Sequence, residues 1–300
     1  MKKKTYLIAL MAMALTLGSC SDNENGIGGE TSKYITVSTS IGNMTRVATD
    51  ANGGQTFEEG DEISVYAWTG APTVAPETSE RVVNNAINKL TNGSWISTPQ
   101  MLWKNNRDKH YFIGVYPTAA ISDLSAGEYT FDETKQVESD LLVAVNKDGL
   151  SYNADEQQTV PLTFTHVMAK LAVNLTYKNQ WGGIPTVEKV VVGNAAKEAT
   201  INYLTKVVTP STTAKEDFSL PEITENTKYV SVIIPQEEVT QLTIVIGGKN
   251  FVYDNGTPFK LESGKITTVN LEVGRDEIKL GDVKITNWED GSTFSGEALN

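Results

Sequence analysis

Short segments in which apolar and polar residues alternate run through the chain from about residue 34 to residue 288. Alternation puts every second side chain on the same face of an extended segment, which predicts β-strands with one buried face. Strands are predicted at 35–41, 62–68, 111–116, 141–145, 159–164, 187–192, 228–234, 242–246, 250–253, 266–273 and 283–288. Stretches 70–95 and 119–138 are polar and predict loops with room for short helices. No window of ten or more residues has convincing helical periodicity, so the pattern predicts an all-β protein.

The apolar positions change parity near residue 170. They are even from Leu162 to Met168 and odd from Leu171 to Leu175. A strand cannot change faces without an inserted residue, so a bulge or break is expected between Met168 and Leu171, where a strand can also leave one sandwich and enter another. About 250 residues of short strands suit two sandwiches better than one. We therefore predict two tandem β-sandwich domains, 47–165 and 166–300.

The first residues predict export. Lys2–Lys4 form a positive segment, and Tyr6–Leu17 is an apolar run too short to span a bilayer, which needs roughly 20 residues. The sequence Leu17-Gly18-Ser19-Cys20 resembles a lipobox, in which two small residues precede an acylated cysteine. Residues 1–19 are therefore predicted to be a lipoprotein signal peptide.

Cys20 is the only cysteine of the chain, so an intrachain disulfide is excluded. A free thiol is the plain alternative, but the place of Cys20 directly after the apolar run favours acylation, for example with palmitate. Each buried CH₂ contributes about 0.8 kcal/mol, and stable anchoring takes more than one acyl chain. We predict that a di- or triacylated Cys20 anchors the mature chain to an envelope membrane.

Residues 20–46 are predicted to be a lipidated tether followed by a single strand. Residues 21–32 are polar and glycine-rich, and the acidic Ser21–Glu24 resembles the signal that sends some lipoproteins to the outer face of the outer membrane, although an ordinary linker explains it too. The strand Ile35–Ile41 precedes a turn-prone stretch with one arginine, Arg46. It is either a separable strand ahead of a trypsin-like cleavage site or the first edge strand of a sandwich.

Charge argues against nucleic acid as a partner. The chain has 25 basic and 37 acidic residues, and loss of residues 1–19 removes three lysines and no acid, which leaves 22 basic residues and a net charge of −15. No basic patch stands out, whereas binding to phosphate backbones needs one.

Candidate chemistry is sparse. The two histidines cannot assemble a zinc site or a serine triad, and we expect His166 in the core and His110 exposed. The acid pairs Glu58-Glu59, Asp61-Glu62 and Asp132-Glu133 are interpreted as solvated turns rather than glycosidase carboxylates. Four tryptophans could form a platform for sugars, but core or rim positions are the usual role: Trp95, Trp103, Trp181 and Trp288. We predict no enzyme activity, no cofactor and no metal.

Several short motifs follow one another along nearly the whole chain. They are Thr45-Arg46-Val47, Phe57-x-x-Gly60-Asp61-x-Ile63-x-Val65-Tyr66, Tyr111-Phe112 through Tyr116-Pro117, Leu162-x-Phe164-x-His166-x-Met168-Ala169-Lys170-Leu171 and Ile285-x-x-Trp288-x-x-Gly291. With the signal peptide and lipobox, this ordered set resembles the fimbrillin-like lipoproteins, the subunits of type V pili.

The resemblance implies two transthyretin-like β-sandwich domains and an outer-membrane lipoprotein precursor. An arginine-specific protease would cut the Arg46–Val47 bond and release the lipid together with the strand Ile35–Ile41. A strand donated by a neighbouring fimbrial subunit would fill the groove, and Val283–Trp288 is the candidate donor here. The expected product is a cell-surface fimbrium that mediates adhesion and biofilm formation.

Three other roles are weighed against this one. Only a dozen residues follow Trp288, which is short for a donor tail, so the resemblance implies either a stalk subunit or a tip subunit that accepts a strand without donating one. An anchor subunit would keep its lipid and first strand. A non-polymerising lipoprotein that binds glycans would show exposed, coplanar tryptophans in a cleft, and a hydrolase would show two carboxylates facing across a pocket.

Overall fold

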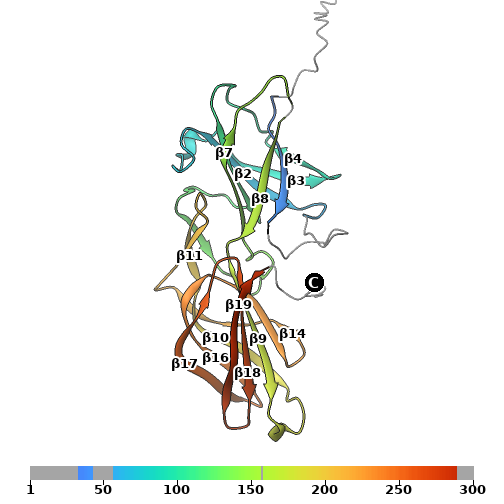
Figure 1. The fold of residues 1–300 in the computed structure, drawn as a ribbon, viewed down its shortest axis with the longest axis vertical. Helices are drawn as coiled ribbons and strands as arrows, with labels where there is room; N and C mark the ends of the chain where they lie inside the picture. Colours follow the sequence, from blue (N-terminus) through green and yellow to red (C-terminus); the bar gives the residue numbers. More distant parts are fainter. Residues whose placement is uncertain (1–32, 43–56, 157, 289–300) are drawn as a thin grey trace, which may run out of the picture. The chain divides into compact units, whose positions relative to one another are not determined.

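The fold is all-β, as the sequence predicts, in a computed structural model that describes residues 33–42, 57–156 and 158–288 (Figure 1). Within these ranges the helices are two single 3-10 turns, η1 (Thr78–Glu80) and η2 (Asn179–Trp181). The strands of the first half are β1 (Thr36–Ile41), β2 (Glu62–Thr69), β3 (Val83–Thr91), β4 (Ser94–Thr98), β5 (His110–Tyr116), β6 (Gly127–Thr130), β7 (Leu142–Leu150) and β8 (Thr159–His166). Those of the second half are β9 (Ala169–Tyr177), β10 (Val187–Ala196), β11 (Glu198–Asn202), β12 (Val207–Pro210), β13 (Lys215–Ser219), β14 (Glu222–Thr224), β15 (Lys228–Ile233), β16 (Gln236–Ile246), β17 (Lys249–Leu261), β18 (Lys265–Val273) and β19 (Ile278–Asn287).

A seven-stranded sheet in the order β1-β8-β7-β5-β2-β3-β4 occupies the N-terminal half. Both faces of its central strands are buried. Ile63 and Val65 of β2 belong to one apolar cluster, whereas Tyr66 and Trp68 belong to a second cluster on the opposite face. The apolar side chains on both faces of β2 therefore reflect a sheet that separates two cores.

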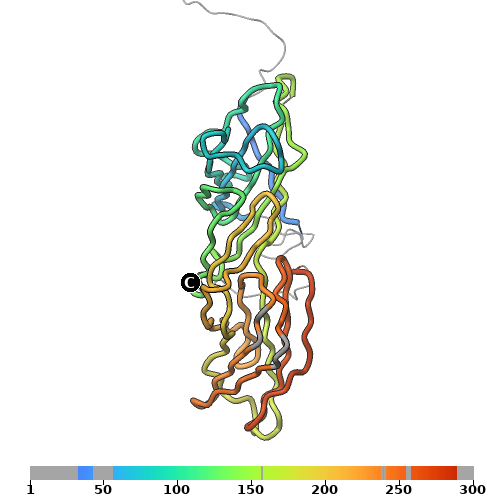
Figure 2. Tube along the Cα trace, turned by 90° about the vertical axis from the view of Figure 1, so that its left-hand side faces the viewer, coloured from blue at the N-terminus to red at the C-terminus, as the bar shows by residue number. Residues whose placement is uncertain are grey.

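Two sheets face each other in the C-terminal half, one in the order β13-β10-β16-β17 and the other in the order β14-β15-β9-β18-β19. Alternate apolar side chains of both sheets, such as Val190 and Ile244 on one and Val173 and Leu271 on the other, share one core. The C-terminal strands β18 and β19 form the red hairpin of Figures 1 and 2. Among the strands that the structure describes, β19 pairs with β18 alone, which makes it an edge of its sheet.

The chain passes between the sheets where the sequence changes parity. Strand β8 ends at His166 in the seven-stranded sheet, and β9 begins at Ala169 in the five-stranded sheet. The break thus lies at residues 167–168, immediately before the predicted interval. A third, three-stranded sheet in the order β12-β11-β6 joins the two halves, because β6 comes from the first and pairs with β11 of the second. The described residues from 33 to 288 accordingly form one compact unit.

The prediction of loops at 70–95 and 119–138 is wrong in part. Strands β3 and β6 lie inside these stretches, and β4 begins in the first of them. Asparagines interrupt the apolar residues of β3. One of these asparagines, Asn88, is itself buried, and its Nδ2 donates to the carbonyl of Ala86 at 3.0 Å. Pairing with β2 therefore outweighs the weak local preference of this segment.

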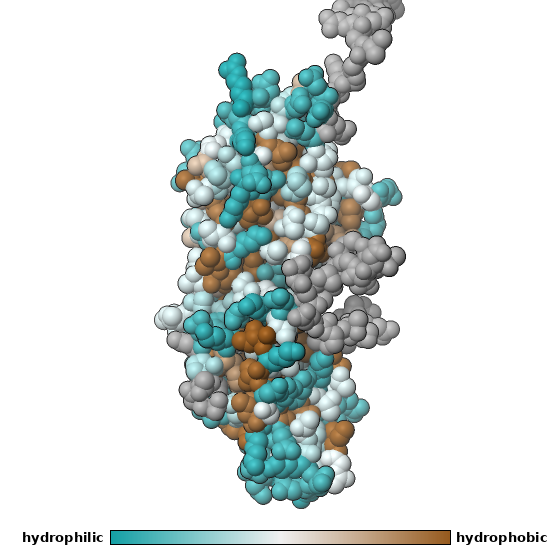
Figure 3. All heavy atoms as spheres, in the orientation of Figure 1, coloured by the Kyte–Doolittle hydropathy of each residue, from teal (hydrophilic) through white to brown (hydrophobic). Residues whose placement is uncertain are grey.

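Large exposed apolar side chains are scattered over the described surface. On the face drawn in Figure 3, brown hydrophobic patches are separated by teal hydrophilic side chains. Isolated apolar side chains of this kind are ordinary on water-facing surfaces. None of the helices in the described ranges has the length and apolarity needed to cross a membrane.

Candidate strand-acceptor groove

Strand β1 lies between two segments that are far from it in the sequence. On one side it pairs in parallel with β8, from Thr36 opposite Thr159 to Ile41 opposite Phe164. On the other side the N–H of Ile35 donates to the carbonyl of Met101 at 2.9 Å. The seven-stranded sheet thus bends until its first strand meets the segment that follows β4. Strand β1 closes this gap, and the site it occupies would be a groove without it.

The inward side chains of this segment, counted from Ile35, which directly precedes β1, complete the core of the curved sheet. Ile35 and Val37 are 2% and 6% exposed. They share an apolar cluster with Val160, Leu162 and Phe164 of β8. Burial of two such side chains contributes about 3–6 kcal/mol, at about 1.5–3 kcal/mol each. Removal of β1 would expose this apolar floor together with the unpaired backbone groups of β8.

The third inward position of β1 is polar and has a specific partner. The indole Nε1–H of Trp95 on β4 donates a hydrogen bond to Oγ1 of Thr39 at 3.0 Å. The indole is held from the other side by Phe57, whose ring meets it edge-on with centroids 5.3 Å apart. Trp95 therefore forms the wall of the groove opposite β8, with its N–H directed at the strand.

Two of the three outward side chains of β1, Thr36 and Ser40, pair their hydroxyls with hydroxyls of β8. Oγ1 of Thr36 lies 3.2 Å from Oγ1 of Thr159, and Oγ of Ser40 lies 3.1 Å from Oγ1 of Thr163. Both pairs are exposed, so each contributes little to stability, but they fix which residue of β1 stands opposite which residue of β8.

Edge strand β19 buries its side chains poorly. Val283 and Ile285 stand opposite Val269 and Thr267 of β18, both fully buried, so they face the core side of the sheet. They nevertheless remain 39% and 37% exposed. The apolar surface of this strand is therefore only partly used within its own sheet.

The residue after β19 is, by contrast, fully buried. The indole ring of Trp288 stacks on the imidazole of His166, with centroids 4.2 Å apart and planes within 9°. Nδ1 of His166 lies 2.8 Å from Oδ1 of Asp140, which is also buried. Nζ of Lys170 lies 4.3 Å from the centroid of the indole. Trp288 thus anchors the end of β19 at the point where β8 gives way to β9.

The two histidines differ in how well the sequence predicts them. His166 is a hydrogen-bonded core residue, as predicted. The expectation that His110 is exposed is wrong: it is fully buried, and its Nε2 accepts the backbone N–H of Lys104 at 3.0 Å. Burial lowers the pKa of His110. Trp103 covers its ring edge-on at 5.0 Å, a tertiary contact that the polar neighbours Asp108 and Lys109 do not reveal.

Asp61 and Asp132 organise their own turns, whereas Glu59 and Glu133 accept the backbone N–H groups of Asn92 and Ser219, which are distant in the sequence. Oδ2 of Asp61 accepts the backbone N–H of Glu58 at 2.8 Å. Oδ1 of Asp132 accepts both the N–H and the hydroxyl of Thr134, and these hydrogen bonds lower the pKa of Asp132. Carboxylates held in this way stabilise turns, which is the role the sequence predicts for them.

The tryptophans do not build a platform for sugars. Trp103 and Trp288 are buried at 8% and 0% exposure. Trp95 donates to Thr39, and Trp181 donates its Nε1–H to the carbonyl of Val273 at 2.9 Å. Each ring thus packs in its own surroundings, which counts against the glycan-binding alternative.

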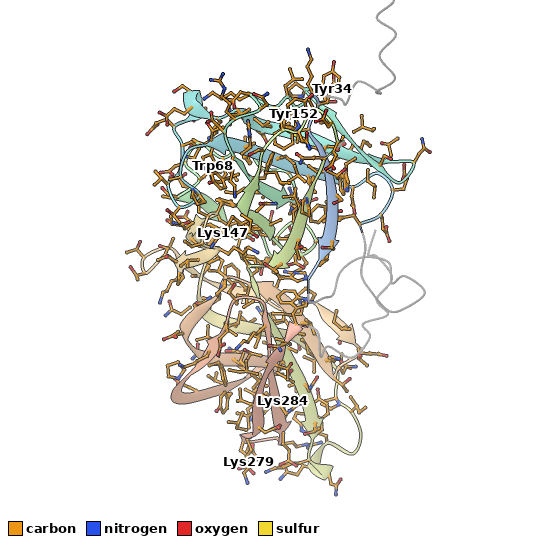
Figure 4. The ribbon with its side chains drawn as sticks, turned by 45° about the horizontal axis from the view of Figure 1, so that its top comes forward. Tyr34, Trp68, Lys147, Tyr152, Lys279 and Lys284 are labelled. Atoms are coloured by element: carbon orange, nitrogen blue, oxygen red, sulfur yellow. The ribbon has the colours of Figure 1, made fainter. Side chains whose placement is uncertain are left out.

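The predicted lipidation and processing residues, Cys20, Arg46 and Val47, lie outside the described residues. The entry to β1 is described. Tyr34 bridges to Leu102 just before the strand, and Figure 4 shows it at the same end of the sheet as Tyr152. The sequence did not reveal Trp95 as part of this groove, because only the closure of the sheet brings β4 next to β1.

Comparison with known proteins identifies the fold. A family model described as fimbrillin-like matches residues 45–288, a span that begins after β1 and ends at Trp288. No curated protein gives a significant match.

Solved structures resemble the chain over most of its length. A candidate cell adhesion protein from Bacteroides uniformis aligns with a TM-score of 0.64 and 18% identity, covering 86% of this chain and all of the other. A second one, from Bacteroides ovatus, gives a TM-score of 0.64 and 17% identity over 85% and 98% of the two chains. A fimbrial protein from Bacteroides vulgatus gives 0.51 and 13% over 84% and 99%. At these identities the likeness shows a shared fold.

Proposed function

The chain belongs to the fimbrillin-like family, and we propose on that basis that it is a stalk or tip subunit of a type V pilus, assembled by donor-strand complementation. The family assigns it to a cell-surface fimbrium, to contacts with other fimbrial subunits and to a non-enzymatic role. Adhesion and biofilm formation are the biological outcomes that we propose for the assembled filament.

The maturation that we propose starts with a lipid anchor. Cys20 is acylated, the precursor reaches the outer membrane, and an arginine-specific protease cuts between Arg46 and Val47. The matched family span begins at residue 45, so β1 lies on the far side of this bond from the rest of the fold. Cleavage would leave β1 held by non-covalent contacts alone.

The proposal rests on the contacts that hold β1 in the seven-stranded sheet. Strand β1 is hydrogen-bonded to β8 along one edge, the preceding Ile35 donates to Met101 on the other side, and the two most buried side chains, Ile35 and Val37, contribute about 3–6 kcal/mol. In the uncut chain β1 also benefits from an effective concentration that is about millimolar for a short link. Cleavage removes this advantage but not the contacts, so a competing strand is needed to displace β1. The retained contacts and the lost effective concentration together favour assembly by strand exchange.

We propose Val283–Trp288 as the donor. Strand β19 is an edge with a single partner, and its core-facing Val283 and Ile285 are more than one-third exposed. Transfer into the groove of a neighbour would bury them more fully and restore the ladder along β8, which is recognition by β-augmentation. Because each joint is head-to-tail, the product is an open filament.

We further propose that 47–165 and 166–300 are two transthyretin-like sandwiches. The passage of the chain from one sheet to another between His166 and Ala169 supports this division. An anchor subunit, which would keep β1 and its lipid, is the second candidate. The pairing of β1 with β8 favours this candidate over a glycan-binding role.

A reversible crosslink tests strand exchange. The side-chain oxygens of Ser40 and Thr163 are 3.1 Å apart, close enough for Ser40→Cys and Thr163→Cys to form a disulfide between β1 and β8. We expect the oxidised double variant, cut by an arginine-specific protease, to stay monomeric and to assemble after reduction. Ser40→Cys alone is the matched control and should assemble in both conditions. Filaments from the oxidised, fully cut double variant would contradict the proposal.

A further inference from the structure

The inner face of β1 has a fixed order of side chains. The first two inward positions, Ile35 and Val37, are apolar and buried, and the third, Thr39, accepts the hydrogen bond of Trp95. The fourth, Ile41, is only partly buried. A strand that replaces β1 in the same direction must therefore present two apolar side chains and then a side-chain oxygen, at alternate positions.

We infer that Trp95 is a specificity-determining residue, which selects incoming strands by the hydrogen-bond acceptor at their third inward position. This inference rests on the proposed function, because it concerns the strand that replaces β1. An apolar side chain at that position would leave the indole N–H without its partner in a site that is partly withdrawn from water. A donor or acceptor left unpaired in this way is costly, whereas a matched apolar pair is nearly neutral. Trp95 thus discriminates mainly against wrong strands.

The rule can be applied to β19 of a second copy of this chain. Two alignments with β1 place apolar residues at both of the first two positions. One uses Val283 and Ile285 and puts Asn287 third, and the other uses Ile278 and Leu280 and puts Asp282 third. Both supply a side-chain oxygen at the position that faces Trp95, which agrees with the rule.

Burial in the resting sheet decides between the two alignments. Ile278 and Leu280 already pack partly against their own core, so their transfer would give up existing contacts. Val283 and Ile285 are 39% and 37% exposed and have more apolar area to bury. An Asn carboxamide also enters a half-buried site at lower cost than a carboxylate does. The alignment we assign therefore places Val283, Ile285 and Asn287 at the positions of Ile35, Val37 and Thr39.

Peptide exchange on the cut chain tests this inference. The protein is the mature chain after complete cleavage at Arg46, and the probes are labelled synthetic peptides that compete with the resident β1 fragment. A peptide of residues 33–42 should bind to the cut chain and not to the uncut chain. Its failure to bind would contradict the proposed function itself, because no groove would have opened.

Peptides of residues 276–288 then test the assigned alignment. Asn287→Leu should weaken binding roughly three- to tenfold, the range expected for one lost hydrogen bond. In the peptide of residues 33–42, Thr39→Val should have a similar effect. Asp282→Ala should leave binding unchanged. If it is Asp282→Ala that weakens binding, or if Asn287→Leu binds as well as the parent, the inference fails while the proposed function stands.

The variant Trp95→Phe tests whether Trp95 is the hydrogen-bond donor that recognises the third inward position. Trp95→Phe keeps an aromatic ring against Phe57 but lacks the N–H donor. In the cut Trp95→Phe chain, the Thr39→Val and parent peptides should bind equally well, which closes a double-mutant cycle. Discrimination that persists in this variant would overturn the assignment to Trp95. The comparison of peptides on the unaltered chain does not depend on the folding of any variant.

Discussion

Trp288 is expected to control whether β19 stays on its own sheet. The indole is fully buried and stacked on His166, whereas Val283 and Ile285 on the strand itself are more than one-third exposed. Trp288→Ala removes the whole indole, and large-to-small changes of this kind cost about 3–5 kcal/mol in a core. Because the rest of β19 is poorly buried, we expect most of this loss to favour local opening of the strand rather than global unfolding.

The expected magnitude makes the effect easy to measure. At 1.4 kcal/mol for each factor of ten, a loss of about 3 kcal/mol raises the open population of β19 at least roughly a hundredfold. Hydrogen exchange under native conditions should show this increase in the backbone amides of β19 and not in those of β15. Trypsin should also cut faster at Lys279 and Lys284, which Figure 4 shows on this strand.

Val283→Ala is the matched control on the same strand, and since Val283 is 39% exposed its effect should be small. Equal acceleration of exchange in β15 and β19 of Trp288→Ala would show that Trp288 is a general core residue and not an anchor of the strand. Exchange in β19 at the rate of the unaltered protein would likewise contradict the anchoring role of Trp288.

Three further predictions concern the surroundings of the groove. Asp140→Ala leaves buried Nδ1 of His166 without its hydrogen-bond partner and should cost about 1–3 kcal/mol in urea unfolding, and Asp140→Asn, which keeps an acceptor, should cost less. Gly114→Ala would bring a Cβ to 2.6 Å from Cζ of Phe164 beneath β1, so we expect a loss of about 1–3 kcal/mol in the same assay. The pKa of His110 is lowered by burial, so the unfolded state takes up the proton first as pH falls. The free energy of unfolding should therefore decrease below about pH 6.5 and continue to fall until the folded state also protonates, and His110→Gln should flatten this dependence in denaturant titrations at several pH values.

The sequence predicts the elements that carry strong alternation or continuous apolar character. The first strand, β2, β5, β8, β15 and β18 follow directly from their patterns, whereas the predicted strands cover only parts of β16, β17 and β19. The change of parity after Met168 also locates the passage between sheets, because parity is a strict geometric consequence of an extended chain. Strands β3 and β6 escaped prediction since their pairing partners, and not their composition, hold them in place.

The groove is predictable only in part. The pattern of β1 shows that Ile35 and Val37 face a core, but nothing local to Thr39 or Trp95 shows that they meet. Their contact depends on the closure of the sheet over a separation of 56 residues. The prediction that His110 is exposed is wrong for the same reason, since its burial comes from tertiary packing against Trp103.

Strand exchange after cleavage at Arg46 can be tested by the intact mass and N-terminal sequence of the protein recovered from sheared surface filaments and from washed membranes. We expect a chain in the filament fraction that starts at Val47 and carries no lipid. A chain found only in membranes, starting at acylated Cys20 and still attached to β1, would contradict strand exchange and leave an anchor subunit or a non-polymerising lipoprotein.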